Sequence, residues 1–407
     1  MLVPESKNRA ACQLLKLFSA LKTPRLSLRP CAFKLLMPRF CSSMLRIGAL
    51  TLLLLTAVAA SAQRRHVLRH DFYVPGEPGI RLFVREVIAT GYRHRAPILL
   101  IHGARVPGIA SFDLDVPGGS LAADLAQRGF AVYIMDVRGY GASTRPREME
   151  SSASQHAPLV RSNQAAHDIG SVVDWMNRRR NARVALLGWA TGGQWAGYYA
   201  SYNPGKIGAL VLLNSLYGGS STHRSVGPGS DLEDPSHPGH FNFTACGGYR
   251  VSDERSLLAP WDRNIPVPDK NSWRDPKVAQ TYVEAALASD ATSGTRTPPS
   301  FRSPCGALED SFYLASGRQL WDASFITAPT LILASELDFW SRPEDRQTLA
   351  AHLVHAPRVK TVVFPQATHF VHRTGQSMAV NSYWTKSAHF SFRATSRNSG
   401  GSSVAEC

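Results

Sequence analysis

The chain has 407 residues, with 45 Lys and Arg against 30 Asp and Glu, which gives a formal net charge of +15. Hydrophobic residues make up 44% and charged residues 18%, and this balance excludes a disordered polyelectrolyte. Six cysteines in this length exclude a disulfide-dense scaffold, and the length suits either one large domain with insertions or two domains.

The positive charge is concentrated at the start of the chain. Residues 1–62 contain nine Lys or Arg and one acidic residue, so they carry more than half of the net charge. From Met44 the sequence has one arginine, an apolar run over 47–60 and the pattern Ala-Ser-Ala. These features predict a secretory signal peptide over 44–62, cleaved after Ala62. The alternative is an uncleaved anchor, although the run is short for a span of ~30 Å.

The export signal has consequences for both ends of the molecule. Residues 1–43 are interpreted as an upstream extension or, alternatively, as a presequence of the organelle type. We expect a secreted or periplasmic protein without a stable membrane span after cleavage. Because such compartments are oxidising, Cys246 and Cys305 are a candidate disulfide, with two unpaired thiols as the alternative.

Strand and helix patterns alternate through the rest of the chain. Strands are predicted at 72–74, 81–88, 97–101, 131–136, 183–188, 209–214, 329–335 and 360–365. Helices are predicted at 120–129, 162–180, 194–202, 278–289 and 343–354. Short buried strands that alternate with helices predict a mostly parallel sheet covered on both faces.

An irregular block rich in Gly, Pro, Ser and Asp interrupts this alternation. The core is predicted to run over 63–216 and to resume over 326–373, with the block at 217–325 forming a lid inserted after the sixth strand. The tail, 374–407, is rich in serine and is predicted to be partly disordered.

Five motifs lie at the ends of the predicted strands. They are IHGA (101–104), DVRGYGAST (136–144), LLGWATGG (186–193), SELDFWSRPED (335–345) and ATHFVH (367–372). In this order and spacing they resemble the α/β-hydrolase fold superfamily of esterase-like and peptidase-like serine hydrolases, over roughly residues 70–372. The resemblance implies a doubly wound, mostly parallel sheet and hydrolysis of small organic esters or amides.

The same resemblance implies the catalytic residues. The family order of nucleophile, acid and base puts the acid at Asp338 and the base at His369, with His372 as a fallback base. The backbone amides of Ala104 and Thr191 would form the oxyanion hole. The family motif G-x-S-x-G has serine at its centre, where this chain has Ala190. An alanine methyl group cannot attack a carbonyl carbon.

Four interpretations of Ala190 remain open. Thr191 is a possible replacement nucleophile. Alternatively, the Asp338–His369 dyad acts without one, activating water or a substrate proton, which permits hydrolysis, a lyase reaction or a cofactor-free oxygenase reaction. A third interpretation is that the chain is a non-catalytic, ligand-binding pseudoenzyme. A fourth is that Ala190 is an engineered replacement of serine. We favour the dyad.

Two segments supply candidate substrate contacts: the loop after the third strand, and the turn at 188–192 that carries the G-x-S-x-G position, here called the elbow. The candidate contacts are His102, Gly103, Arg105 and Trp189. Arg105 either meets a substrate carboxylate or is a solvated surface residue, and Trp189 either lines a pocket or belongs to the core. No P-loop, dinucleotide-binding glycine motif or zinc-ligand pattern occurs, so the expected partner is a small molecule, with no cofactor, metal or nucleic acid.

Overall fold

The structure is a computed structural model that describes residues 66–92 and 96–373. The predicted extension (1–43), signal peptide (44–62) and serine-rich tail (374–407) lie outside the described residues. Within the described residues, none of the helices combines the length and the apolar character that a membrane crossing requires.

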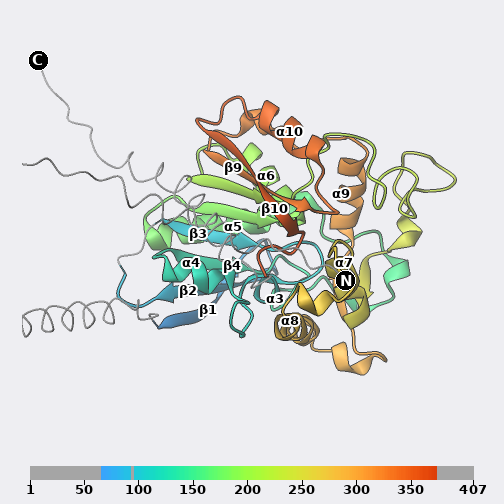
Figure 1. Cartoon of the computed structure of the whole chain (residues 1–407), viewed down its shortest axis with the longest axis horizontal. Coiled ribbons are helices and arrows are strands. Elements are labelled where there is room, and N and C mark those ends of the chain that lie inside the picture. The colour runs from blue at the N-terminus through green and yellow to red at the C-terminus, as the bar shows by residue number, and fades with distance from the viewer. Residues whose placement is uncertain (1–65, 93–95, 374–407) are drawn as a thin grey trace, which may run out of the picture. The chain divides into compact units, whose positions relative to one another are not determined.

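An eight-stranded sheet forms the centre of the described chain, in the order β1-β2-β4-β3-β5-β6-β9-β10 (Figure 1). Its strands are β1 (Val67–Pro75), β2 (Arg81–Ala89), β3 (Pro97–Ile101), β4 (Ala131–Met135), β5 (Ala185–Trp189), β6 (Ala209–Leu213), β9 (Thr330–Leu337) and β10 (Val359–Thr368). The pairs β1–β2 and β2–β4 are antiparallel, and all the other pairs are parallel. The predicted mostly parallel sheet is therefore confirmed.

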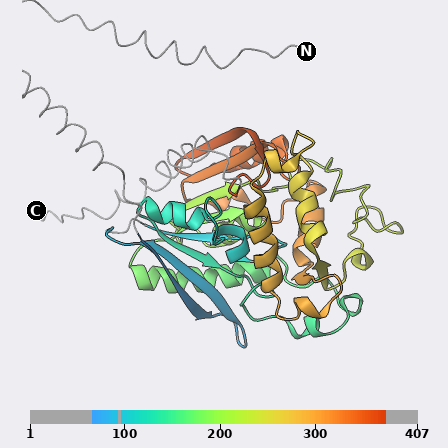
Figure 2. The same cartoon turned by 60° about the horizontal axis from the view of Figure 1, so that its bottom comes forward.

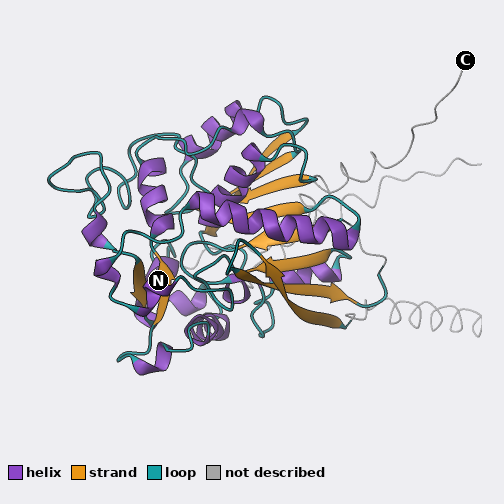
Figure 3. Cartoon of the chain, turned by 180° about the vertical axis from the view of Figure 1, so that it is seen from behind, coloured by secondary structure: helices purple, strands orange, loops and turns teal. Residues whose placement is uncertain are grey.

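Helices cover both faces of this sheet. The α-helices of the described chain are α3 (Gly108–Phe112), α4 (Leu121–Gln127), α5 (Ser162–Arg180), α6 (Thr191–Tyr202), α7 (Glu254–Asp262), α8 (Pro276–Ala288), α9 (Gly306–Ala315) and α10 (Pro343–His352). Alternate residues of one strand pack on opposite layers: Leu100 lies in the core with α3 and α4, and Leu99 lies in the core with α5 and α6. Figure 3 shows the long helix α5 in front of one face of the sheet. The predicted double winding is confirmed.

The chain between β6 and β9, here called the β6–β9 segment (residues 214–329), contains α7, α8, α9 and a small antiparallel sheet. That sheet pairs β7 (Tyr249–Ser252) with β8 (Phe301–Pro304). A disulfide joins Cys246 to Cys305 across the segment. The three helices stand together beside the main sheet, coloured from yellow to orange in Figure 2, and α8 packs against α3 and α7.

Sequence periodicity predicted α8 in this segment but not α7 or α9. Helix α7 contains Pro260, which normally argues against a helix because proline has no backbone N–H. Helix α9 is buried on most sides, so its sequence lacks the polar stripe that marks an amphipathic helix.

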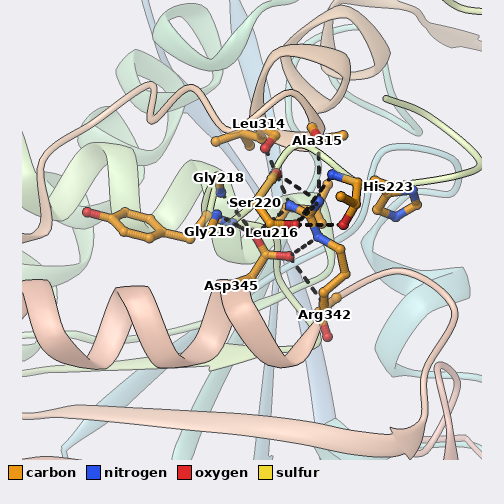
Figure 4. Close-up of polar contacts among 12 residues, drawn as sticks. Leu216, Gly218, Gly219, Ser220, His223, Leu314, Ala315, Arg342 and Asp345 are labelled. Atoms are coloured by element: carbon orange, nitrogen blue, oxygen red, sulfur yellow. Dashed lines mark hydrogen bonds and ion pairs between the residues drawn. The ribbon is translucent and has the colours of Figure 1, made fainter. Parts of the chain in front are cut away.

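A buried ion pair fastens the β6–β9 segment to α10 (Figure 4). The Asp345 carboxylate accepts hydrogen bonds from Arg342 and from the backbone N–H groups of Tyr217, Gly218 and Gly219. Arg342 also donates to the Ser220 carbonyl at 2.9 Å. Burial alone would raise the pKa of Asp345, but the hydrogen bonds and the Arg342 charge hold this pKa below its usual value. The pair therefore attaches the loop that follows β6 to the start of α10.

Replacing the charged carboxylate at this junction should destabilise the fold. We expect Asp345→Asn to lower the free energy of unfolding by about 3 kcal/mol, because Arg342 loses its buried counter-charge. The neighbouring Glu344 is exposed, so the control Glu344→Gln should change stability by less than about 0.5 kcal/mol. Urea denaturation measures both values, and equal stability of the two variants would contradict the assigned role.

Candidate active site

A sharp turn between β5 and α6 places Ala190 at the carboxyl edge of the sheet. Ala190 has φ 53° and ψ −120°, a strained backbone conformation for a residue with a side chain. Its N–H donates to the Leu213 carbonyl at 2.8 Å. The flanking glycines permit the turn: a Cβ on Gly188 would lie 2.2 Å from the Gly192 carbonyl oxygen, and one on Gly192 would lie 2.2 Å from the Ile101 carbonyl oxygen. The geometry of an elbow is therefore complete around a methyl group.

Asp338 and His369 meet because β9 and β10 are parallel neighbours. The last paired residues of these strands are Leu337 and Thr368, and the two functional residues follow directly. His369 Nδ1 lies 2.7 Å from Asp338 Oδ1, and the two side chains are only 7% and 1% exposed. The carboxylate also accepts the backbone N–H of Ser341 at 2.9 Å.

This arrangement fixes the tautomer of His369. A carboxylate beside Nδ1 holds the ring proton there, which leaves Nε2 as the proton acceptor. Nε2 makes no hydrogen bond to any residue that the structure describes. The imidazole can therefore accept a proton at Nε2, and the Asp338 carboxylate would stabilise the imidazolium that results.

The elbow and the dyad are joined through the backbone of His369. Its carbonyl accepts the indole N–H of Trp189 and the side-chain amide of Asn214, each at 3.1 Å. The rings of Trp189 and His369 have centroids 5.1 Å apart. Trp189, a candidate substrate contact, is thus 4% exposed and supports the base. Asn214, which ends the strand motif ALVLLN, was not among the predicted site residues, although a polar residue closing a buried strand is a usable signal.

His372, the fallback base, lies in a different environment. Its ring packs 4.4 Å from that of Trp189 and is nearly fully buried, and Nε2 accepts a hydrogen bond from Arg373. Burial, followed by the charges of Arg373 and His369, holds the pKa of His372 well below its usual range. No ion pair between His372 and a described carboxylate is present. Of these two histidines, only His369 therefore contacts a described carboxylate.

The two predicted oxyanion donors border the elbow. Neither the N–H of Ala104 nor that of Thr191 has a hydrogen-bond partner within 66–92 and 96–373. Thr191 is the first residue of α6, where backbone N–H groups are unsatisfied and the helix dipole favours negative charge. The Ala104 carbonyl accepts hydrogen bonds from the Tyr140 hydroxyl at 3.0 Å and from Arg250 at 2.9 Å, which fixes the orientation of its loop.

The loop before Ala104 contacts the elbow directly. A Cβ built on Gly103 would lie 3.4 Å from the Ala190 methyl carbon. His102 is fully buried and uses both ring nitrogens within the protein: Nε2 accepts the Val137 N–H at 3.1 Å, and Nδ1 donates to the Gly103 carbonyl at 2.7 Å. Burial lowers the pKa of His102 to about 4. This side chain therefore shapes the loop as a neutral ring and has no nitrogen left for a substrate.

Arg105 extends from the same loop toward the β6–β9 segment. Its Nη1 donates to the Ser256 carbonyl at 2.5 Å. In a regular helix that carbonyl would accept the N–H of the residue four positions later, which is Pro260 and has none. Arg105 thus replaces a missing hydrogen bond of α7. Arg250, the other arginine at Ala104, lies in the irregular block, where no sequence pattern pointed to it.

The model of the alpha/beta hydrolase fold family matches residues 96–376. The match spans more than half of the chain, and the chain therefore belongs to the α/β-hydrolase fold family. The comparison with curated protein sequences gives no match. The described residues contain no group of three or more His, Cys, Asp or Glu side chains suited to holding a metal ion.

Solved structures of hydrolases share this fold. A thioesterase domain from the curacin biosynthetic pathway is 16% identical, with 79% of this chain and 100% of that chain covered and a TM-score of 0.50. A proline iminopeptidase from Mycobacterium smegmatis is 18% identical over 80% and 99% of the two chains, with a TM-score of 0.48. A thermophilic esterase from Thermogutta terrifontis is 15% identical over 80% and 99%, with a TM-score of 0.47. At these identities the likeness concerns the fold.

The close approach of backbones at the elbow gives a stability prediction. We expect Gly192→Ala to lower the free energy of unfolding by more than about 2 kcal/mol, because the new methyl group meets the Ile101 and His102 carbonyl oxygens. The control is Gly294→Ala, whose Cβ would meet no atom within 4 Å and which should stay within about 0.5 kcal/mol of the parent. Chemical denaturation measures both, and a fully stable Gly192→Ala protein would refute the packing described.

The neutral state of His102 gives a pH prediction. Because its folded pKa, about 4, lies below the unfolded value of 6.5, the unfolded chain binds more protons between these values. The stabilising contribution is complete above pH 6.5 and is lost as the pH falls to 4, by about 3 kcal/mol. The stability difference between the parent and His102→Gln should therefore shrink by that amount between pH 7 and pH 4. Parallel pH profiles would disprove this assignment.

Proposed function

We propose that this chain hydrolyses small organic esters or amides with the Asp338–His369 dyad and an oxyanion hole, without a serine nucleophile. The observation that carries the proposal is the 2.7 Å contact between His369 Nδ1 and Asp338, which leaves Nε2 without a partner among the described residues. The hydrolase fold and the hydrolases of similar structure support the reaction class.

The proposed reaction attacks the substrate with water. As the water oxygen bonds to the carbonyl carbon, His369 Nε2 takes a proton from it, and the carbonyl π electrons move to the oxygen. The amides of Ala104 and Thr191 stabilise that oxyanion, and Asp338 stabilises the imidazolium. When the tetrahedral intermediate collapses, the bond to the leaving group breaks, and His369 returns the proton to the leaving oxygen or nitrogen.

The methyl group of Ala190 suits this route. Alanine lacks the one oxygen that serine would add at the elbow, so in the proposed reaction a water molecule supplies the attacking oxygen. Thr191 is the weaker candidate for a nucleophile, because it begins α6, is 2% exposed and is needed for its backbone N–H.

We further propose that α7 and α8 of the β6–β9 segment form the cover of the site. Trp261 of α7 stacks on Phe370, the residue after the base, with centroids 5.0 Å apart and planes inclined by 18°. Tyr282 of α8 lies 6.3 Å from the same ring. These aromatic contacts with the residue after His369 support the proposed cover.

Removing the base should abolish turnover. We expect His369→Gln to lower kcat/KM for a hydrolysed ester or amide by ~10²-fold or more, because general-base assistance of this size is lost. His372→Gln, checked for folding by thermal denaturation, and Thr191→Val should retain most of the activity. Natural protein should be insensitive to serine-directed acylating agents.

The discriminating variant is Ala190→Ser, assayed across esters, amides and epoxides with product analysis and oxygen uptake. Turnover by the natural protein that is lost with His369 supports the dyad. Activity and acylation that arise only in Ala190→Ser would contradict the proposal and indicate a binding protein that has lost serine chemistry. Products of elimination, or oxygen consumption, would instead assign a lyase or cofactor-free oxygenase reaction.

A further inference from the structure

Two arginines without acidic partners border the proposed oxyanion loop. Arg250 donates through Nη2 to the Ala104 carbonyl at 2.9 Å and through Nε to Ser303 Oγ at 3.3 Å. Arg105 is the next residue after Ala104 and donates through Nη1 to the Ser256 carbonyl. Both guanidinium groups therefore bond neutral oxygens, and neither forms an ion pair with a described residue.

Two acidic side chains belong to segments that contact this loop through Ser256 and Val137, and both make other hydrogen bonds. Asp253 caps α7 by accepting the Ser256 N–H at 2.9 Å. Asp136 accepts backbone N–H groups of Gly108 at 2.7 Å and Ala142 at 3.0 Å. The positive charge at the loop thus stays uncompensated within the described chain.

Partial burial makes this positive charge unusual. Both side chains are half-buried, and Arg250 is close enough to Arg105 for their charges to repel. Burial first, and then the Arg105 charge, lowers the pKa of Arg250 to about 9, so the group is still cationic at neutral pH. Buried charges in proteins are normally paired, because an unpaired charge in a poorly solvated place is costly.

A third cation lies in the same neighbourhood. Arg373 is 1% exposed, and its guanidinium forms no ion pair with a described carboxylate. Its guanidinium lies 4.0 Å from the centroid of Tyr282 and 4.9 Å from that of Trp189, beside the elbow. These aromatic faces stabilise the cation without neutralising it. Arg373 therefore adds a third positive charge beside the elbow.

We propose that Arg105 and Arg250 bind a carboxylate of the substrate, so that the preferred substrates are anionic esters or amides. Nε and Nη2 of Arg105 and Nη1 of Arg250 make no hydrogen bond to a described residue, and arginine N–H groups match carboxylate oxygens in geometry and charge. That the substrate is an ester or amide rests on the proposed function, whereas the carboxylate-binding site does not depend on it.

The arrangement also couples binding to chemistry. Arg250 holds the Ala104 carbonyl, and the N–H of the same residue is a proposed oxyanion donor. A carboxylate that settles on Arg250 would therefore anchor the substrate next to the group that stabilises the developing charge.

The test compares monomethyl succinate with dimethyl succinate as ligands, by calorimetry on the His369→Gln protein so that neither is consumed. We expect the charged half-ester to bind at least ~10-fold more tightly, as hydrogen bonds to charged groups imply. Equal binding of the two esters by this protein would overturn the proposal without any arginine variant. Inorganic phosphate that binds as tightly as the half-ester would overturn the choice of a carboxylate.

Added to the same background, Arg105→Gln and Arg250→Gln should each weaken the half-ester by ~10-fold or more and leave the diester unchanged. Arg250→Lys, which keeps the charge, should lie between, and it replaces Arg250→Gln if that protein does not fold. The matched control is Arg255→Gln on the exposed face of α7, with an expected change below twofold. Undiminished half-ester binding by folded Arg105→Gln and Arg250 variants would overturn the assignment.

The two proposals fail separately. Arginine-dependent binding of the half-ester without hydrolysis by the natural protein would count against the proposed function and leave the carboxylate site in place. Hydrolysis that depends on His369 but shows no preference for the free carboxylate would support the proposed function and overturn the carboxylate site.

Discussion

The backbone carbonyl of His369 is the point on which the site depends. Trp189, at the end of β5, and Asn214, directly after β6, both donate to it, so the ends of two strands hold the loop that follows β10. The parallel register of β9 and β10 then brings Asp338 to the imidazole. The dyad is therefore a property of the sheet edge, where rigid elements fix the side chains on neighbouring loops.

The elbow retains its strain although its central residue has no nucleophilic atom. Ala190 has a positive φ. At Gly188 and Gly192 the neighbouring backbone lies so close that a Cβ would not fit. Strained geometry of this kind persists only when the surroundings impose it. Here it leaves the Thr191 N–H at the start of α6 without a hydrogen-bond partner among the described residues, and the proposed oxyanion donor does not require a serine hydroxyl.

Much of this architecture was predictable from local sequence. The boundaries of α5, 162–180, follow from its helical periodicity, and the strand-end motifs located Asp338, His369 and Ala190. These signals are short-range, because a buried strand and the polar loop after it are adjacent in the chain.

The features that the sequence did not predict depend on contacts between residues far apart in the chain. Helix α7 tolerates Pro260 because Arg105, 151 residues before Ser256, supplies the hydrogen bond that proline cannot. Arg250 reaches the Ala104 carbonyl from the irregular block, and the role of His102 follows from Val137, a residue of the next loop. In each case a side chain satisfies a backbone group distant in sequence, and residue patterns carry no record of such pairings.

In the proposed reaction water, and no protein side chain, attacks the substrate. Intact-mass spectrometry of the natural protein, quenched during turnover of an ester, tests it most directly. We expect product to form while the protein mass stays unmodified at every time point. A transient mass increase equal to the acyl group, on Thr191 or on any other residue, would contradict it.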